Sequence, residues 1–238
     1  MSSFIFNGVS SDELGLMITK PIVRPSWAAM YSELTTSGGI RKVMQRMSTF
    51  DNASFSIETY ADDASADNIR KIFKALNGYG RLIISTAPDE YLNVILNPIT
   101  PVPVALLAAE ISISVTAWPF AYAIAPTEYN LTDAVNYMEV NNRGTIFSAP
   151  EIHLKGSGNV TINVNGAEFI VKIPADISSR EIIVDCDSQV AYYMDGESRI
   201  SITHRTYNNF PLLHEGANYI KHTGEVSEMK CNVRERWL

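Results

Sequence analysis

The chain has 238 residues, 46% of them hydrophobic and 19% charged, which gives enough apolar mass for one large core or two modest ones. Its net charge of -7 is unfavourable for nucleic-acid binding, because such proteins gain most of their affinity from clustered Lys and Arg. The densest basic stretch, Arg41-Lys42 with Arg46, is short and precedes acidic segments. We therefore expect a globular protein without sequence-specific nucleic-acid binding.

The start of the chain has neither the basic residues nor the uninterrupted apolar stretch of a secretory signal. The longest apolar run, Val102 to Ala109, is broken by Pro103 and is far below the roughly 20 residues that a membrane span requires. Two cysteines, Cys186 and Cys231, are too few for a disulfide framework and fit no metal motif. These features predict a soluble chain, not exported by a cleaved signal, with buried thiols on strands.

The first predicted elements are extended. Phe4-Ile5-Phe6 precedes an Asn7-Gly8 turn and a second extended segment. Further along, Phe55 and Ile57 alternate with polar neighbours, as in a strand with one buried face.

A helix is predicted after this strand. Apolar residues recur at the i, i+3, i+4, i+7 spacing of one helical face, and they are Ile69, Ile72, Phe73 and Leu76. Ser65 or Asp67 can cap its start, and Asn77-Gly78 can end it. We expect the helix to cover a sheet with its apolar face.

More strands complete the first half. Residues 81–86 and 91–96 read as two strands separated by a Pro88-Asp89 turn, and 110–117 alternate cleanly between apolar and polar residues. We expect 110–117 to be the last strand of a first domain. Between them, residues 97–109 contain three prolines and predict a projecting loop or arm.

The domain boundary is expected near residue 140. Trp118-Pro119-Phe120 and about two dozen residues of mixed character after it suit a connector. We therefore predict an N-terminal domain over residues 1–140 and a C-terminal domain over residues 141–238.

The second half has no helical period and reads as all-β. Val160, Ile162 and Val164 alternate with polar residues up to Asn165-Gly166, which favours a type I′ turn, and the alternation returns from Phe169. Further strands are predicted at 152–154, 182–186, 190–194, 199–204 and 225–233. This spacing predicts a β-sandwich. The fold class is mainly β, with one helix in the N-terminal domain.

Candidate chemical sites are few. The histidines have no spacing that gathers metal ligands, and they are His153, His204, His214 and His222. Asp185 and Asp187 flank Cys186 in an apparent strand, so both carboxylates would lie on one face; two carboxylates could serve a glycosidase, but solvation is the favoured reading. Asp62-Asp63, Asp195 and Glu197 read as turn and cap residues.

No nucleophile or cofactor motif is present in the sequence. Gly78-Tyr79-Gly80 and Gly156-Ser157-Gly158 match neither a P-loop nor a dinucleotide-binding loop, and read as turns. Seven aromatic residues could stack on sugars or bases, but are more often core or interface, and they are Trp27, Tyr31, Trp118, Phe120, Tyr122, Tyr192 and Tyr193. We predict no catalytic, cofactor-binding or metal-binding residue, no cofactor, and no enzymatic activity.

Short motifs at the start of the chain and over its last hundred residues resemble the distal tail protein (Dit) family of siphophages. The first is Phe4-Ile5-Phe6-Asn7-Gly8-Val9 followed by Ser11-Asp12 and Leu14-Gly15-Leu16. The others, in family order, are Asn142-Arg143-Gly144-Thr145, Ala149-Pro150, Gly156-Ser157-Gly158, Phe210-Pro211-Leu212-Leu213 and Glu215-Gly216-Ala217-Asn218. One departure is Thr36-Ser37-Gly38-Gly39-Ile40, where a Pro-Gly-Arg-type loop is expected.

The resemblance implies a structural component of the virion at the phage tail tip, made in the host cytoplasm. It implies a homohexameric ring built by the N-terminal domains, with galectin-like C-terminal sandwiches projecting outward. Such a ring joins the tail tube to the tip or baseplate proteins and leaves a channel for DNA, and an acidic lumen would not retain DNA. Its partners are therefore other copies of itself and tail proteins, with no membrane.

Two other functions remain open. The first is a carbohydrate-binding module for host attachment, although the second half has only Trp237 as a Trp platform. The second is a cell-wall hydrolase, which would require an acid, base or metal set that the sequence does not show.

Overall fold

The computed structural model describes residues 2–27, 29–35, 42–98, 101–105, 107–134 and 136–238. The chain divides into two compact units, residues 1–124 with Leu238 (unit 1) and residues 125–237 (unit 2). The domain ranges 1–140 and 141–238 remain predictions. The segment expected as a connector is nevertheless largely strand: it contains β11 (Thr127–Asn130) and the start of β12 (Met138–Asn142), which pair with a strand of unit 2.

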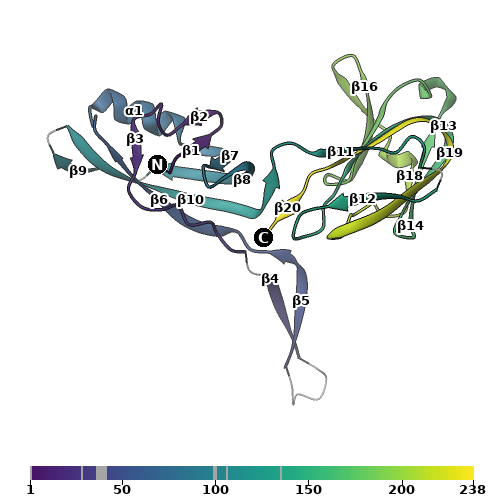
Figure 1. Ribbon diagram of the computed structural model, residues 1–238, viewed down its shortest axis with the longest axis horizontal. Coiled ribbons are helices and arrows are strands. Elements are labelled where there is room, and N and C mark those ends of the chain that lie inside the picture. Colours follow the sequence, from purple (N-terminus) through teal and green to yellow (C-terminus); the bar gives the residue numbers. More distant parts are fainter. Residues whose placement is uncertain (1, 28, 36–41, 99–100, 106, 135) are drawn as a thin grey trace. The chain divides into compact units, whose positions relative to one another are not determined.

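Unit 1 is built on an antiparallel sheet whose strands follow the order β2-β1-β7-β8-β10-β6-β3, with β9 beside the start of β10 (Figure 1). The strands are β1 (Phe4–Phe6), β2 (Val9–Ser10), β3 (Leu16–Ile18), β6 (Ala53–Ala61), β7 (Gly78–Ile84), β8 (Ala87–Pro98), β9 (Val102–Ala105) and β10 (Ala108–Ala123). A mainly β fold with an α-helix in unit 1 was predicted, and the structure confirms it.

The core of unit 1 comes from strand residues that alternate with exposed neighbours. Ile111, Ile113, Val115 and Ala117 of β10 are fully buried, as the alternation predicted. Helix α1 (Ala66–Ala75) adds Ile72 and Leu76, while Ile69 and Phe73 are half-buried. Ser65 caps α1 by accepting the Asn68 N–H at 3.4 Å, and Asp63 accepts the Ser65 N–H, which confirms the predicted turn and cap chemistry.

Three local predictions in unit 1 were wrong. Gly78-Tyr79-Gly80, predicted as a turn, is the start of β7 and pairs with β8. The turn between β7 and β8 is formed by Ser85-Thr86, since Ile84 pairs with Ala87, and the predicted Pro88-Asp89 turn lies inside β8. Pro88 lies beyond the last β8–β10 pair, Glu90 with Ala123, so its missing N–H interrupts no hydrogen bond of that ladder. The expected connector at Trp118-Pro119-Phe120 is a bulge in β10, where the register shifts and Phe120 has φ 79°.

A hairpin of β4 (Ala29–Thr35) and β5 (Lys42–Phe50) forms a separate two-stranded sheet (Figure 1). Within the described residues, neither strand pairs with the sheet of unit 1. The Phe50 ring lies 5.1 Å from the Phe120 ring at the base of the hairpin. The loop Thr36–Ile40, where the sequence differs from the Dit family pattern, lies outside the described residues.

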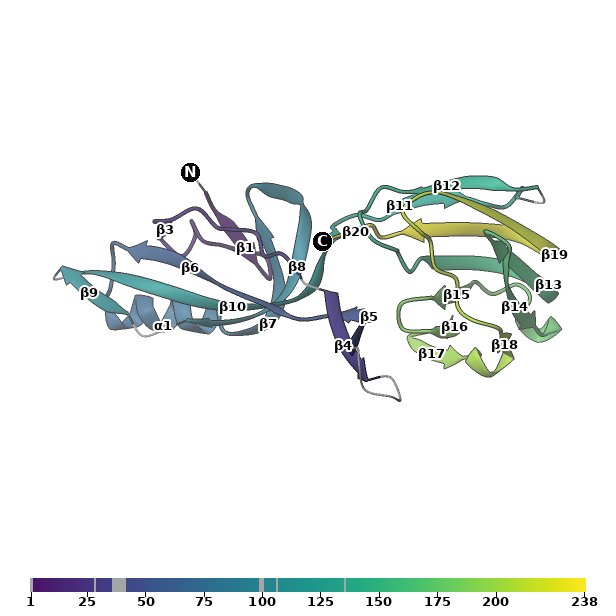
Figure 2. The ribbon, with the colours of Figure 1, turned by 90° about the horizontal axis from the view of Figure 1, so that it is seen from below.

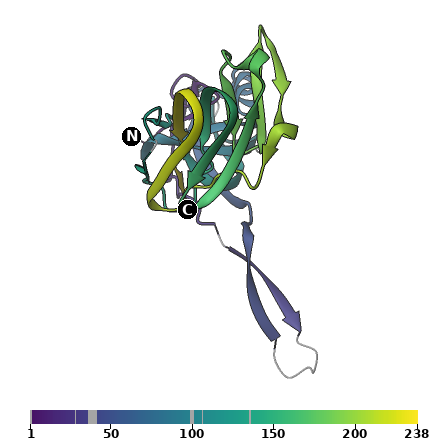
Figure 3. The same cartoon turned by 90° about the vertical axis from the view of Figure 1, so that its right-hand side faces the viewer.

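In its described residues, unit 2 is all-β apart from two short 3-10 helices, η1 (Ala175–Ile177) and η2 (Thr203–Arg205). Its strands follow the order β11-β19-β13-β15-β16-β17, and β12 pairs with β19, β14 with β13, and β18 with β14. Figure 3 shows β19 and β13 side by side. The strands are β13 (Glu151–Val164), β14 (Ala167–Ile173), β15 (Ile182–Asp185), β16 (Val190–Asp195), β17 (Ser198–Ser201), β18 (Thr206–Tyr207), β19 (Gly216–Val233) and β20 (Arg236–Trp237).

Two long strands hold unit 2 together. The first part of β13 pairs with β15 and its last part with β14, while β19 pairs with β12 near its start and with β11 near its end. Gly156-Ser157-Gly158, predicted as a turn, lies within β13 at two register shifts against β19, so the predicted strands 152–154 and 160–164 are one strand. A Cβ at Gly156 would lie 2.2 Å from the Glu225 carbonyl oxygen, which explains the glycine.

Of the remaining predictions in unit 2, one hairpin is confirmed and two strands have different bounds. The β13–β14 hairpin is confirmed, with Asn165 at φ 53° and Gly166 at φ 91° as a type I′ turn requires. The predicted strand 199–204 ends at Ser201 and gives way to η2, and the predicted strand 225–233 begins at Gly216. The core is a single apolar cluster that includes Ile152, Val160 and Phe169.

Candidate interaction surfaces

His153 lies between two carboxylates on the surface of unit 2. Its Nε2 is 2.7 Å from Glu151 Oε1, and its Nδ1 is 3.2 Å from Glu181 Oε1. The hydrogen bond to Glu151 raises the pKa of His153 and lowers the pKa of Glu151. Because the carboxylates contact opposite ring nitrogens, they do not converge on one point as metal ligands would.

The other histidines are apart from this cluster. His204 and His214 are exposed, and His222 is buried with Nε2 at 3.0 Å from the Thr132 carbonyl oxygen. In the described part of the chain, no group of three His, Cys, Asp or Glu side chains could hold a metal ion. Sequence reasoning missed the partners of His153, although Glu151 precedes it by two residues and so shares its face of β13.

The predicted geometry of Asp185 and Asp187 was wrong, because β15 ends at Asp185 and the next four residues form a turn. Asp185 Oδ1 accepts the Asp187 and Ser188 N–H groups, at 3.0 and 3.1 Å. Asp187 instead contacts Arg236, with 2.5 Å between Oδ1 and Nη2. Each carboxylate therefore has its own structural partner, and the pair does not form an acid–base dyad.

Both thiols are free and buried, but only Cys231 lies on a strand, since Cys186 is in the turn after β15. Burial raises the pKa of Cys186 well above its usual value and that of Cys231 to about 12. Cys186 directly follows β15, and β15 and β19 flank β13 on opposite sides, so two interstrand spacings, roughly 10 Å, separate the two cysteines. That separation is too long for a disulfide.

Two hollows on the described surface contain no set of catalytic groups. A small cavity in unit 1 is lined by apolar residues of β7 and β8 and by the Arg24–Glu90 ion pair. A shallow groove in unit 2 is lined by Ser157, Ser178, Glu225 and Ser227 beside Gly156. Ser157 Oγ donates to the Glu225 carboxylate, but the lining residues of this groove include no histidine or lysine that could complete an activated nucleophile.

The distinctive turn motifs are structural clamps. Asn7, at φ 49°, accepts the Arg81 N–H at 2.9 Å through Oδ1 and donates to the Tyr79 carbonyl through Nδ2. The turn after β1 is thereby fixed to β7. A Cβ at Gly80 would lie 2.3 Å from the Asn7 side chain, so this clamp also requires that glycine.

The Asn142-Arg143-Gly144-Thr145 motif holds the end of the unit 2 chain. The buried Asn142 side chain donates to the Ile146 and Leu213 carbonyls and accepts the Gly144 N–H. Arg143 Nε donates to the fully buried Glu235 at 3.1 Å. A Cβ at Gly144 would lie 2.3 Å from the backbone oxygen of Arg236, so only glycine fits.

A second buried amide organises the Glu215-Gly216-Ala217-Asn218 turn. Asn218 Nδ2 donates to the His214 and Gly216 carbonyls, and Oδ1 accepts from the His214 N–H and from Asn165 Nδ2. Asn165 Oδ1 in turn accepts the Tyr219 N–H at 2.8 Å. These bonds join the turn before β19 to the turn of the β13–β14 hairpin.

The outward face of the unit 1 sheet has a patch of aromatic and aliphatic side chains on neighbouring strands. We call it the aromatic patch and define it as Tyr79, Ile95 and Trp118. Tyr79 pairs with Ile95 across β7 and β8, and its ring meets the Trp118 ring edge to face at 4.9 Å. Tyr79 is 63% exposed and Ile95 37%. Next to the patch, the Arg81 guanidinium lies 4.6 Å from the centre of the Tyr91 ring, which stacks on Tyr122.

The β9 arm, defined as the described residues of 101–107, lies at the start of β10 (Figure 2). Val102, Val104 and Leu107 are between 50% and 63% exposed, although each is a large aliphatic residue. A projecting arm was predicted from the prolines, and this segment forms a strand whose four residues are all exposed.

The sequence alone did not reveal the aromatic patch, because its members come from three strands and meet only through the register.

The fold is similar to those of two solved phage proteins. The structural similarity is strong with the SPP1 Dit (gp 19.1) protein, described as a paradigm of the hub adsorption apparatus in Gram-positive infecting phages, with TM-score 0.76 and 12% identity over 100% of both chains. A chain of the phage P2 baseplate, in its activated conformation with Ca, is also similar, with TM-score 0.56 and 11% identity over 99% of this chain and 98% of that chain. No protein-family model and no curated protein sequence matches. The resemblance to the Dit family is thereby confirmed at the level of the fold.

A membrane-spanning helix is not found among the described residues, since none of the helices there is both long and apolar enough.

Proposed function

We propose that this chain is a structural, non-enzymatic protein of a bacteriophage tail tip and that six copies assemble into a ring. The ring joins the tail tube to the tip or baseplate proteins and leaves a central channel for DNA. The observation that carries this proposal is the match to the SPP1 Dit hub protein over the whole length of both chains, units 1 and 2 included.

The isolated β4–β5 hairpin supports self-assembly. Two-stranded hairpins are marginally stable in water unless a further strand or layer covers them. This hairpin has seven and nine residues in its strands and pairs with no other described strand. A neighbouring copy in a ring would supply the missing cover, and heterologous contacts of this kind form a ring when the rotation between copies closes.

The charge of the chain supports a channel that does not retain DNA. The net charge is -7, and the outward face of β6 and β10 has Glu58 among serines and threonines. Glu58 accepts hydrogen bonds from Ser56 and Ser112. An assembled ring whose lumen is lined by Lys and Arg would contradict this part of the proposal.

The decisive experiment is electron microscopy of the purified full-length protein with mass measurement in solution. We expect closed particles with six copies around one axis. A strict monomer at high concentration, also in the presence of tail tube and tip proteins, would contradict the proposal.

Carbohydrate binding by unit 2 is a second candidate, favoured by two exposed tyrosines. Tyr137 and Tyr219 are 50% and 49% exposed, and Lys221 Nζ lies 4.6 Å from the centre of the Tyr137 ring. The Tyr137 hydroxyl donates to Asn163 Oδ1. Rings with an amide and an ammonium beside them can bind saccharides. Glycan-array binding that is lost in Tyr137→Ala and Tyr219→Ala would favour this candidate, and silence of the full-length protein would count against it.

A further inference from the structure

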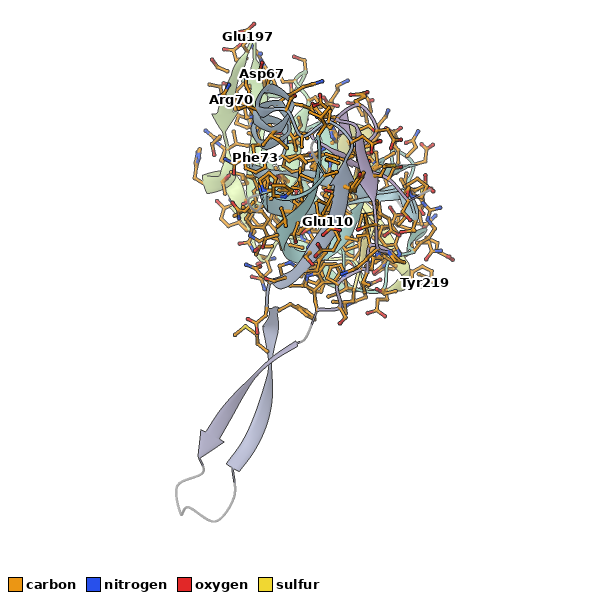
Figure 4. The ribbon with its side chains drawn as sticks, turned by 90° about the vertical axis from the view of Figure 1, so that its left-hand side faces the viewer. Asp67, Arg70, Phe73, Glu110, Glu197 and Tyr219 are labelled. Carbon is orange, nitrogen blue, oxygen red and sulfur yellow. The ribbon has the colours of Figure 1, made fainter. Side chains whose placement is uncertain are left out.

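The β9 arm and the aromatic patch lie on one sheet at different levels along β10. Val102 pairs with Glu110, Glu110 with Tyr60, and Tyr60 with Met17, which places the arm at the row of Glu110. Ile95 of the patch pairs with Thr116, six residues further along β10. At the rise of a strand, these two rows are roughly 20 Å apart. Figure 4 shows Glu110 on β10, away from α1 and its exposed residues Asp67 and Arg70.

Both surfaces expose apolar side chains that the described residues of the same chain leave uncovered. The run from Pro101 to Ala109 contains no charged residue, and its aliphatic side chains at 102, 104 and 107 are at least half exposed. The patch offers an exposed Tyr79 ring and the half-buried Trp118. Exposed apolar groups of this kind mark protein contacts, and aliphatic groups pack well on aromatic rings.

Opposite charges adjoin the two surfaces. Glu110 pairs with Val102 at the base of the arm, and Arg81 lies two residues from Tyr79 on the same face of β7. Among the residues that the structure describes, neither Glu110 nor Arg81 forms an ion pair. A carboxylate beside the arm and a guanidinium beside the patch are therefore complementary between two molecules.

We propose that the β9 arm of one copy docks on the aromatic patch of the next copy, with Glu110 of the first beside Arg81 of the second. The β9 arm and the aromatic patch lie at different ends of one sheet. Each copy therefore contacts one neighbour through its arm and the other neighbour through its patch, as a heterologous contact requires. This inference rests on the proposed ring and specifies one of its contacts. The β9 strand has Pro103 on its exposed edge, so side-chain packing rather than added strand pairing forms the contact.

Cysteine cross-linking tests the contact. Val104→Cys protein is mixed with Tyr79→Cys protein and treated with a short bismaleimide; the native thiols are buried and do not compete. We expect a covalent dimer in the mixture, much less product from either variant alone, and a ladder from the double variant that ends at the ring size. Asp67→Cys, on the exposed surface of α1, is the matched control and should give no product with Tyr79→Cys.

Charge reversal provides a second readout. Glu110→Lys and Arg81→Glu are each expected to weaken assembly roughly tenfold, and the double variant to recover most of the loss. Circular dichroism confirms that each variant is folded. Two results would overturn this contact and leave the ring intact, provided that the wild type forms an oligomer. The first is no covalent dimer from the mixture of Val104→Cys and Tyr79→Cys proteins. The second is normal assembly of the charge variants. A monomeric wild type would overturn the ring and this contact together.

Discussion

Asn141 and Asn142 are neighbours on β12 with opposite surroundings. Asn142 is buried and forms three side-chain hydrogen bonds to backbone groups, whereas Asn141 is exposed. We expect Asn142→Ala to lower the free energy of unfolding by about 2 to 4 kcal/mol, because it leaves buried backbone groups without partners. Asn141→Ala is the control and should change it little. Urea unfolding of both variants measures the difference, and equal midpoints would contradict the assignment.

His153 should make stability depend on pH. Its folded pKa is raised, so its contribution is complete below the unfolded value of 6.5 and is lost as pH rises through the raised folded value. The pKa of Glu151 is lowered, so its contribution is present above 4.5 and is lost as pH falls through the lowered value. Thermal unfolding between pH 5 and 9 should therefore show a loss of stability as pH rises above 6.5, and His153→Gln should reduce that loss. The exposed His204→Gln should retain the full loss.

The two cysteines should be inert in the folded protein. Both are buried, and burial raises both pKa values, so almost no thiolate is accessible at neutral pH. A colorimetric thiol reagent should label neither in native buffer and both in denaturant. Rapid labelling of the native protein would show that unit 2 opens locally around β15 or β19.

At the scale of elements, we expect that the β4–β5 hairpin can be removed without loss of the unit 1 fold. Since neither strand pairs with the sheet of unit 1 within the described residues, replacing residues 31–48 by a short turn should leave that sheet folded. The proposed ring should weaken, because the hairpin would no longer contact a neighbour. Shortening the β16–β17 hairpin at Gly196-Glu197 is the control. Circular dichroism and light scattering separate the two effects, and an intact ring without the β4–β5 hairpin would contradict its role.

Elements with strong local signals could be predicted from the sequence. Helix α1 has an apolar face and a capping serine, and the β13–β14 hairpin has alternation on both sides of Asn165-Gly166. The continuity of β13 could not be predicted, because Gly156-Ser157-Gly158 has the composition of a turn. Pairing of Gly156 and Ser157 with β19, and of Gly158 with β14, keeps the chain extended there. Local preference was overridden by tertiary pairing.

The contacts on the surface were harder to predict for the same reason. Glu181, the residue before β15, reaches His153, and the aromatic patch unites residues of β7, β8 and β10. Such groupings depend on strand order and register, which alternation along one strand does not determine. The absence of recognisable catalytic motifs, by contrast, could be assessed from sequence spacing alone.

At the scale of the whole molecule, each unit has its own buried core. Residues 125–238 expressed alone should fold cooperatively with a β-type circular dichroism spectrum, because the contacts of the unit 2 core lie within that range. Residues 1–124 should likewise form a folded protein. Dispersed amide resonances in an NMR spectrum check both, and an unfolded 125–238 fragment would show that the units depend on one another.

The strand layout of unit 2 also determines how it responds to mechanical load. Thr127 pairs with Val233, so the chain enters and leaves this unit at the same end of β19. A force that separates the two termini would peel β11 from β19 one residue pair at a time. A force between that end and the turns at Asn165-Gly166 and Gly216 acts along β13 and β19 instead, and must shear many interstrand hydrogen bonds at once. Unit 2 should therefore resist tension applied at its far turns much better than tension between its termini.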